Sequence, residues 1–398
     1  MKKSWKIIVQ LLLVTSLLMT SCGQKQSKET PNKPKKGEEK QKILDASGTI
    51  ELPYPLCVKK DGKTVGGTLN IAEPSSTPFE GIFNSFLQET TTDQDLCQPM
   101  WGVFMKSGPN NEIVDGGYCN VKFDKDAKTA TYELNKKLTW SDGVPVTSDD
   151  LIFVYNCIAN KDYTGVRYDS DYQNVVGIEE YHDGKADTIS GLKKIDDKTL
   201  QVTFKEFYPG ILWGAGLTYN VEPEHYLKDV PLKDMESSDK VRLKPLSCGP
   251  FVVSNIVPGE SVEYVPNPHW FGEKPKLDKI VYKRTNPDTI VEALKSGEFD
   301  VVDGLPADHY NEYKDLSNIT LLSNVERTVD YIGFKLGKWD TKTGQVVMDP
   351  NMKMSDVKLR EAIAYAANTK EVSTQFYNGL RIPANTLLDP RHSTFWDS

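Results

Sequence analysis

The residues that most often carry enzyme chemistry do not gather into a motif in this sequence of 398 residues. No pattern typical of a serine hydrolase (GxSxG), a zinc protease (HExxH), a P-loop or a dinucleotide-binding fold is present. The glycine cluster Gly214-Ala215-Gly216 has the wrong spacing for binding phosphate. We therefore predict no catalytic residue and no enzyme activity. The five histidines, which form no pattern of nucleophile and base, are His182, His225, His269, His309 and His392.

The six cysteines show no metal-binding spacing. There is no C-x-x-C pair, and no histidine lies at the spacing of a zinc ligand, so we predict no metal and no cofactor. If the cysteines after Cys22 form disulfides, their odd number leaves at least one thiol free, and the sequence does not reveal the pairing. Cys157 falls in a predicted helix, where a buried apolar role is expected. These later cysteines are Cys57, Cys97, Cys119, Cys157 and Cys248.

The balance of charge is acidic, with 48 basic residues, 56 acidic residues and a formal net charge of −8. Proteins that bind nucleic acid usually present a basic surface, so we predict no nucleic-acid partner. The hydrophobic fraction of 38% and the charged fraction of 26% are ordinary for a globular protein, and the length suffices for two or three domains.

The N-terminus has the organisation of an export signal. Lysines precede an apolar run from Ile7 to Met19, which is too short to span a bilayer and fits the core of a signal peptide. Small residues then lead directly into Cys22, as in the signals of bacterial lipoproteins. We predict a signal peptide over residues 1–22, with Cys22 lipidated as the first mature residue. A plain secretory peptide with an incidental cysteine is the alternative.

Residues 23–42 are polar and rich in lysine. Because such a segment cannot bury enough apolar surface to fold, we predict a disordered tether with a reach of about 25 Å. Its basic charge suits an anionic membrane surface, from which the acidic body would be held off. A generic solvated linker is the alternative.

A strand, a turn and a helix are predicted in succession over residues 132–158. Tyr132 and Leu134 alternate with polar residues as in a strand, and a turn follows at residues 141–143. Thr147, with Asp150 three residues later, is a capping-box signal for the start of a helix. The apolar residues that recur at helical spacing after this signal are Leu151, Val154, Tyr155 and Ile158.

Other segments carry similar local signals. Asn286, Pro287 and Gly297 frame a second helix as its N-cap, its first residue and its C-cap. The buried face of this helix is predicted to consist of Ile290, Val291 and Leu294. Apolar residues, most clearly where they alternate, predict strands near residues 66–72, 121–123, 129–134, 200–204 and 278–282.

Several of these segments resemble the family 5 extracellular solute-binding proteins, which are the oligopeptide- and dipeptide-binding receptors of bacterial ABC importers. The stretch from Trp140 to Asp150 is similar to the family's WSDG turn and the P-x-T-x-x-D sequence that follows it. Further matches occur in the family's order at residues 66–69, 247–251, 267–271, 297–301, 331–334 and 356–366.

The resemblance implies an α/β, two-lobe periplasmic-binding-protein-like fold of type II, in its peptide-binding subclass. It implies lobe I over residues 43–284 and part of lobe II over residues 285–398. Family members usually run on further, so we expect a C-terminally truncated chain whose second lobe is incomplete; an unusually short member is the alternative. Residues 331–334 are expected to form a strand of lobe II, with Phe334 in its core.

The resemblance also implies where a ligand would bind. The family's lobe I contacts come from the loop after the first strand and from an aromatic residue beyond the capped helix. Carried over by position, these are Glu80, Gly81, Ile82 and Tyr168. Tyr331 is expected to face the cleft from lobe II. Ordinary packing is the alternative for Ile82 and for Tyr168.

The implied function is capture of oligopeptides and their delivery to the permease subunits of an ABC transporter through closure of the lobes. The protein would act as a monomer on the outer face of the cell membrane, attached through Cys22. The alternatives are a peptide-pheromone receptor of the same fold, a nickel- or haem-binding member of the family, and a secreted lipid-anchored hydrolase. The sequence leaves open the preferred peptide length and sequence, and whether the chain as it stands binds ligand.

Overall fold

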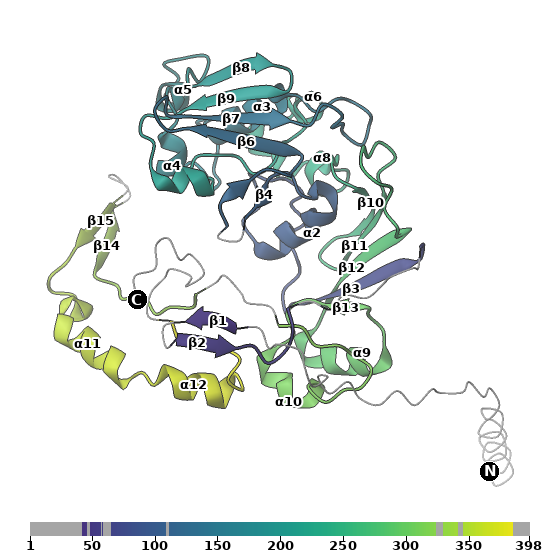
Figure 1. Cartoon of the computed structure of the whole chain (residues 1–398). Helices are drawn as coiled ribbons and strands as arrows, with labels where there is room; N and C mark the ends of the chain where they lie inside the picture. Colours follow the sequence, from purple (N-terminus) through teal and green to yellow (C-terminus); the bar gives the residue numbers. More distant parts are fainter. Residues whose placement is uncertain are drawn as a thin grey trace, which may run out of the picture. The chain divides into compact units, whose positions relative to one another are not determined.

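Two main β-sheets organise the part of the chain that the computed structural model describes (Figure 1). The predicted signal peptide, Cys22, residues 23–41 of the predicted tether and Cys57 lie outside the described residues. The described ranges are residues 42–45, 48–56, 58, 65–108, 111–323, 329–340 and 345–384.

The larger sheet has five strands in the order β10-β11-β12-β3-β13. β12, β3 and β13 run parallel to one another, whereas β10 and β11 are antiparallel to their neighbours. Because β3 is covered on both faces, its consecutive residues Ile71 and Ala72 enter two different cores, one beside α2 and one beside α9. The strands are β3 (Thr68–Pro74), β10 (Phe251–Val257), β11 (Ser261–Pro266), β12 (Lys279–Thr285) and β13 (Val301–Val302).

The residues on the two sides of the predicted lobe boundary share this sheet. The boundary between residues 284 and 285 falls at the end of β12, yet β13 lies beyond it and pairs with β3. The segment before β3 also reaches past the boundary, because the Tyr54 amide donates to the Ser323 hydroxyl at 3.2 Å and the hydroxyls of Tyr54 and Tyr310 lie 2.9 Å apart.

The second sheet has four antiparallel strands in the order β6-β7-β9-β8. Leu200 and Val202 alternate into its core, which confirms the strand predicted near residues 200–204. Helix α3 (Ser148–Ile158) packs against β8 and β9 and contributes its apolar stripe to the same core. The strands are β6 (Cys119–Asp124), β7 (Thr129–Leu134), β8 (Leu192–Asp196) and β9 (Thr199–Thr203).

The predicted turn and capped helix are confirmed, and a buried carboxylate joins them. Thr147 is the N-cap of α3, and its side chain and that of Asp150 complete the predicted capping box. Asp150, which is 3% exposed, also accepts hydrogen bonds from the indole of Trp140 (3.2 Å) and the amide of Glu224 (2.9 Å). Asp150 thus joins the turn, α3 and the start of α6 (Glu224–Leu227) through hydrogen bonds.

The helix predicted between Asn286 and Gly297 is also confirmed. Asn286 caps a single 3-10 turn, η2 (Pro287–Thr289), which leads into α9 (Ile290–Ser296), and Gly297 ends α9 in the left-handed conformation. The predicted buried face is buried. The remaining helices before α9 are α2 (Thr91–Trp101), α4 (Ser170–Gln173), α5 (Ile178–His182), α6 (Glu224–Leu227), α7 (Leu232–Met235) and α8 (Asp239–Arg242), with the 3-10 turn η1 (Pro209–Trp213).

The strand predicted at residues 331–334 is wrong. These residues belong to no helix or strand and pair with no strand among the described residues, Phe334 is half-buried rather than in a core, and the hairpin of β14 and β15 follows instead. Gly333 offers no side chain to pack, which weakens a strand at this position. The small paired strands are β1 (Lys42–Asp45), β2 (Gly48–Glu51), β4 (Lys106–Ser107), β5 (Ile113–Val114), β14 (Gly337–Asp340) and β15 (Gln345–Met348).

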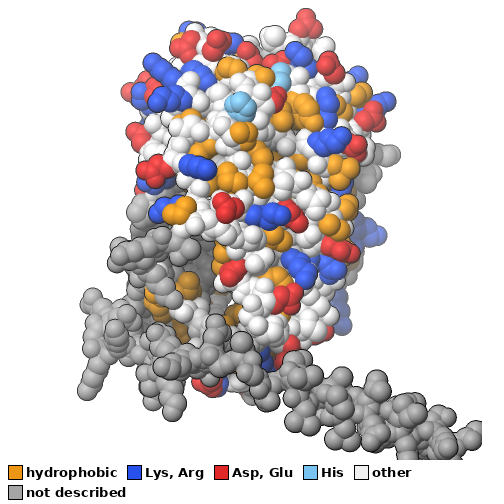
Figure 2. All heavy atoms as spheres, turned by 90° about the vertical axis from the view of Figure 1, so that its right-hand side faces the viewer, with side chains coloured by type: hydrophobic (Ala, Val, Ile, Leu, Met, Phe, Trp, Pro, Cys, Tyr) orange, Lys and Arg blue, Asp and Glu red, His pale blue; other side chains and the backbone are white. Residues whose placement is uncertain are grey.

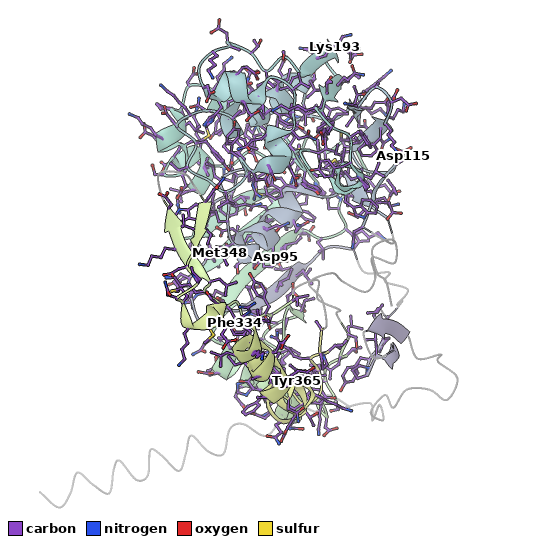
Figure 3. All side chains as sticks on the ribbon, turned by 90° about the vertical axis from the view of Figure 1, so that its left-hand side faces the viewer. Asp95, Asp115, Lys193, Phe334, Met348 and Tyr365 are labelled. Atoms are coloured by element: carbon purple, nitrogen blue, oxygen red, sulfur yellow. The ribbon has the colours of Figure 1, made fainter. Side chains whose placement is uncertain are left out.

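The last described helices keep their apolar side chains at the surface. The helix predicted at residues 356–366 is confirmed as α11, capped by Asp356, but none of its side chains is buried among the described residues. Tyr365 of α11 and Met348 of β15, both labelled in Figure 3, are 92% and 59% exposed. The remaining elements are η3 (Ala307–His309), α10 (Tyr310–Tyr313), η4 (Lys353–Ser355), α11 (Val357–Ala366) and α12 (Thr369–Phe376).

Candidate functional site

The loop between β3 and α2, residues 75–90, carries the predicted contacts Glu80, Gly81 and Ile82. A buried carboxylate shapes it from within, because Asp93 accepts the amide of Gly81 at 2.9 Å and that of Ile82 at 3.4 Å. Gly81 has a φ of +77°, a conformation that side chains disfavour. The turn at Gly81 is therefore held to the first turn of α2, where Asp93 lies.

The side chains of these three residues have different surroundings. Glu80 is exposed, and its carbonyl accepts a hydrogen bond from the guanidinium of Arg242 at 2.6 Å. Ile82 is only 3% exposed and lies in the core of the four-stranded sheet. Its side chain thus packs, as the alternative interpretation of the sequence held, and the Glu80 side chain is the one that faces solvent.

The second half of the loop, the Asn84–Gln88 turn, is fixed by more distant parts of the chain. The amide of Ser85 donates to the carboxylate of Glu222 at 2.6 Å. The hydroxyl of Tyr163 donates to the backbone carbonyl of Phe86 at 2.6 Å. The guanidinium of Arg167 donates to the backbone carbonyl of Gln88 at 2.9 Å. These contacts hold the loop against the segment that follows α3.

Tyr168 belongs to that segment, so it lies on a part of the chain that contacts the second half of the loop, at Phe86 and Gln88, rather than the predicted contact residues 80–82. Its ring stacks on the imidazole of His182, with centroids 4.2 Å apart and planes 17° apart, and it packs against the large core. One face of the Tyr168 ring is consequently already in use. The neighbouring Arg167 and Tyr163, rather than Tyr168 itself, make the direct contacts to the loop.

Tyr331 lies apart from these residues in the extended segment 329–336. Its side chain is 74% exposed, and no hydrogen bond or ring contact among the described residues joins it to the β3–α2 loop or to Tyr168. That Tyr331 faces a cleft from lobe II stays a prediction.

A group of carboxylates marks the ends of the parallel strands. Glu73 at the end of β3 interacts with Asp303, which follows β13, and with Asp95 of α2, which is labelled in Figure 3. Burial raises the pKa of Glu73 to about 7, and the two neighbouring carboxylates add to the rise. Burial and the charges of the same three acids raise the pKa of Tyr282 to about 12. This part of the sheet favours positive groups over negative ones.

The face drawn in Figure 2 carries no basic patch, and the described residues carry no cluster of metal ligands. On the face drawn in Figure 2, acidic and basic side chains are interspersed rather than gathered into a basic patch. Among the described residues, no group of three or more histidine, cysteine, aspartate or glutamate side chains is arranged to hold a metal ion. Within the same ranges, no helix combines the length and the apolar character needed to cross a membrane.

Sequence reasoning missed the residues that hold the loop, namely Asp93, Tyr163, Arg167, Glu222 and Arg242. One signal was present for Asp93: Thr90-x-x-Asp93 has the spacing of a capping box, and Thr90 does accept the amide of Asp93. The carboxylate of Asp93, however, turns to the loop amides. The other four act across long sequence separations, which no local pattern reveals.

Comparisons with known proteins agree with this architecture. The family model "Bacterial extracellular solute-binding proteins, family 5 Middle" matches residues 119–398. The oligopeptide-binding protein OppA of Lactococcus lactis subsp. lactis is 36% identical over 98% of this chain and 64% of its own length. The oligopeptide-binding protein AppA of Bacillus subtilis is 25% identical over 95% of this chain and 60% of its own length. This chain thus spans less than two thirds of the length of these curated relatives.

Solved structures give the same result. Lactococcal OppA, complexed with an endogenous peptide in the closed conformation, matches with a TM-score of 0.78 at 38% identity and covers 84% of this chain and 63% of its own. Bacillus subtilis AppA in complex with a nonapeptide matches in fold alone, with a TM-score of 0.65 at 21% identity over 82% of this chain and 59% of its own. The predicted α/β fold of the type II class is confirmed. Because the family model matches most of the chain and a relative is 36% identical along nearly all of it, the protein belongs to the bacterial extracellular solute-binding proteins of family 5.

Proposed function

We propose that this protein captures oligopeptides outside the cytoplasm and delivers them to the permease of an ABC importer. The observation that carries the proposal is the 36% identity to an oligopeptide-binding protein over 98% of this chain. The β3–α2 loop supports it, because a loop held by buried carboxylates offers a preformed surface, which lowers the entropy that binding must overcome.

We propose that ligand contacts come from the β3–α2 loop and the segment beside it. Glu80 would contact peptide through its exposed side chain, whereas Gly81 and Ile82 would shape the backbone on which Glu80 stands. Tyr168 would contribute the ring face that His182 leaves open. Tyr331 would contribute from lobe II when the lobes close.

The other features of the proposal follow from the sequence. Cys22, lipidated and left as the first mature residue when the signal peptide before it is cleaved, would anchor a monomer to the outer face of the cell membrane through the tether of residues 23–42. Lobe I would span residues 43–284 and lobe II would begin at residue 285. The protein would have no catalytic activity, and its work would consist of binding and closure.

Mass spectrometry of ligands released from the purified protein tests this function. We expect a mixture of peptides with varied sequences. One defined peptide would favour a pheromone receptor, and a metal or haem in place of peptide would favour the other branches of the family. Incubation of the protein with the recovered peptides should leave them intact, and cleavage products would support a hydrolase.

A further inference from the structure

The amide of Ser85 is held by a carboxylate from a remote part of the chain. Glu222 lies 137 residues further along, is only 5% exposed, and accepts this amide at 2.6 Å. Ser85 lies in the turn of residues 84–88, which begins two residues after Ile82, the last predicted contact residue of this loop. Charged acceptors form stronger hydrogen bonds than neutral ones, so this contact carries more weight than an ordinary turn bond.

Glu222 is itself fixed on its other side. Val221 before it is buried in the large core, and the amide of Glu224 after it donates to Asp150 at 2.9 Å. Asp150 in turn caps α3. The Glu222 carboxylate therefore connects the β3–α2 loop to the framework built on α3, with little freedom to follow the loop if the loop moves.

Some polar side-chain atoms of the turn have no hydrogen-bond partner among the described residues. Asn84 uses its side-chain oxygen to accept the amides of Phe86 and Leu87. Among the described residues, the side-chain amide nitrogen of Asn84, the hydroxyl oxygen of Ser85 and the side-chain oxygen of Gln88 are buried without a partner. Buried polar groups without partners weaken a conformation, so the turn depends on its outside contacts.

We propose that Glu222 is a positioning residue for ligand capture: its ionised carboxylate holds the Ser85 amide and thereby sets the β3–α2 loop that presents Glu80 to peptide. The proposal deepens the function proposed above and rests on it. Glu222 touches no ligand in this account and acts through the loop alone.

The surroundings of Glu222 make its hydrogen bond with the Ser85 amide sensitive to pH. The titratable groups that interact with it are the Asp150 carboxylate and Cys157 of α3, Cys97 of α2, and Cys248, and no cation balances it among the described residues. Burial, with a smaller contribution from the Asp150 carboxylate, raises the pKa of Glu222 to about 7, and the hydrogen bond from the Ser85 amide opposes the rise. The carboxylate is thus ionised in mildly alkaline solution and protonated in mildly acidic solution, where it accepts a weaker bond.

Peptide affinity measured at pH 6 and pH 8.5 tests the proposal, with one peptide recovered from the protein as the probe. We expect the wild-type protein to bind this peptide several-fold more weakly at pH 6. The Glu222→Gln variant, which keeps a neutral acceptor, should bind at both pH values about as the wild type does at pH 6, apart from any titration of the peptide itself. Glu292→Gln, which alters an exposed glutamate on α9, should follow the wild type. A Glu222→Gln variant with the full wild-type dependence on pH would overturn the proposal.

Amide hydrogen exchange without ligand gives a second readout of the same loop. At pH 8.5, residues 80–90 should exchange several-fold faster in Glu222→Gln than in the wild type, and at pH 6 the two should agree. If the variant and the wild type exchanged equally fast at pH 8.5 as well as at pH 6, the positioning role would be overturned. If exchange differs as expected but no form binds peptide, the proposed function fails while the role of Glu222 in the loop stands. Should Glu222→Gln fail to fold, the wild type alone decides the question. Its protection of residues 80–90, taken relative to that of strand β7, should be lower at pH 6 than at pH 8.5, and an unchanged ratio would overturn the positioning role.

Discussion

At the scale of single residues, buried carboxylates join segments of this protein by accepting hydrogen bonds from backbone amides. Asp93, Asp150 and Glu222 each bind at least one amide from another segment. A carboxylate offers several acceptor positions, so one side chain can satisfy donors from more than one element. The β3–α2 loop and the framework beneath it are thereby joined through a few acidic side chains rather than through regular strand pairing.

Replacing Asp150 by alanine should destabilise the fold strongly. The change leaves the indole of Trp140 and the amides of Thr147 and Glu224 without their acceptor. Unsatisfied buried donors cost about 1–3 kcal/mol each, so we expect a loss of about 3 kcal/mol or more in the free energy of unfolding, measured by urea denaturation. Asp149→Ala removes only an exposed ion pair with Lys194 and should cost less than about 1 kcal/mol. Equal losses would contradict the role given to Asp150.

The raised pKa of Glu73 predicts that the stability of the folded protein depends on pH. Burial raises its pKa from 4.5 to about 7, so the folded protein binds more protons than the unfolded chain between these values. The stability that this protonation provides is present below about pH 4.5 and is lost as the pH rises through about 7. Glu73→Gln cannot ionise, so its melting temperature relative to the wild type should be higher at pH 8 than at pH 5. Glu292→Gln should show no such trend, and a flat difference for Glu73→Gln would refute the prediction.

At the scale of elements, the segment Ser247–Phe251 shows what a short motif does physically. The hydroxyl of Ser247 and the amide of Gly249 both donate to the carbonyl of Met100, near the end of α2. A side-chain carbon on Gly249 would lie 2.3 Å from this carbonyl oxygen. The motif therefore joins the start of β10 to the last turn of α2, and only glycine allows the approach.

Two glycine substitutions separate a steric effect from a conformational one. Gly249→Ala forces the Met100 carbonyl away and should cost about 3 kcal/mol or more in the free energy of unfolding. Gly297→Ala meets no atom within 4 Å and only strains the left-handed end of α9, so it should cost about 1 kcal/mol. Urea denaturation of both variants measures the difference. If Gly297→Ala proved the more damaging, the close approach at Gly249 would not be the reason for its glycine.

Elements with local signals could be predicted from the sequence, and elements that depend on a distant partner could not. The capping box at Thr147 and the caps at Asn286 and Gly297 are local, and the structure has the helices they predict. A strand at residues 331–334 needs a partner that no local pattern names, and that prediction was wrong. Glu222 and Arg242, which hold the loop by its backbone, lie more than a hundred residues from it, and no local pattern pairs residues at that separation.

At the scale of the whole molecule, the account depends on one connection between structure and function. The framework around α3 and α2 fixes the β3–α2 loop, which exposes the Glu80 side chain and contacts the segment that contains Tyr168 through Phe86 and Gln88. The family to which the chain belongs and the peptide-binding relatives it resembles give this arrangement its proposed role. The signal peptide and tether predicted before residue 43 would place it outside the cell.

Titration calorimetry with a pool of varied oligopeptides tests the central claim most directly. The account predicts saturable binding with a dissociation constant of about 1 µM or lower, and no binding of the same residues supplied as free amino acids. Absence of saturable binding to any peptide in the pool, by a protein whose melting curve shows it to be folded, would contradict it.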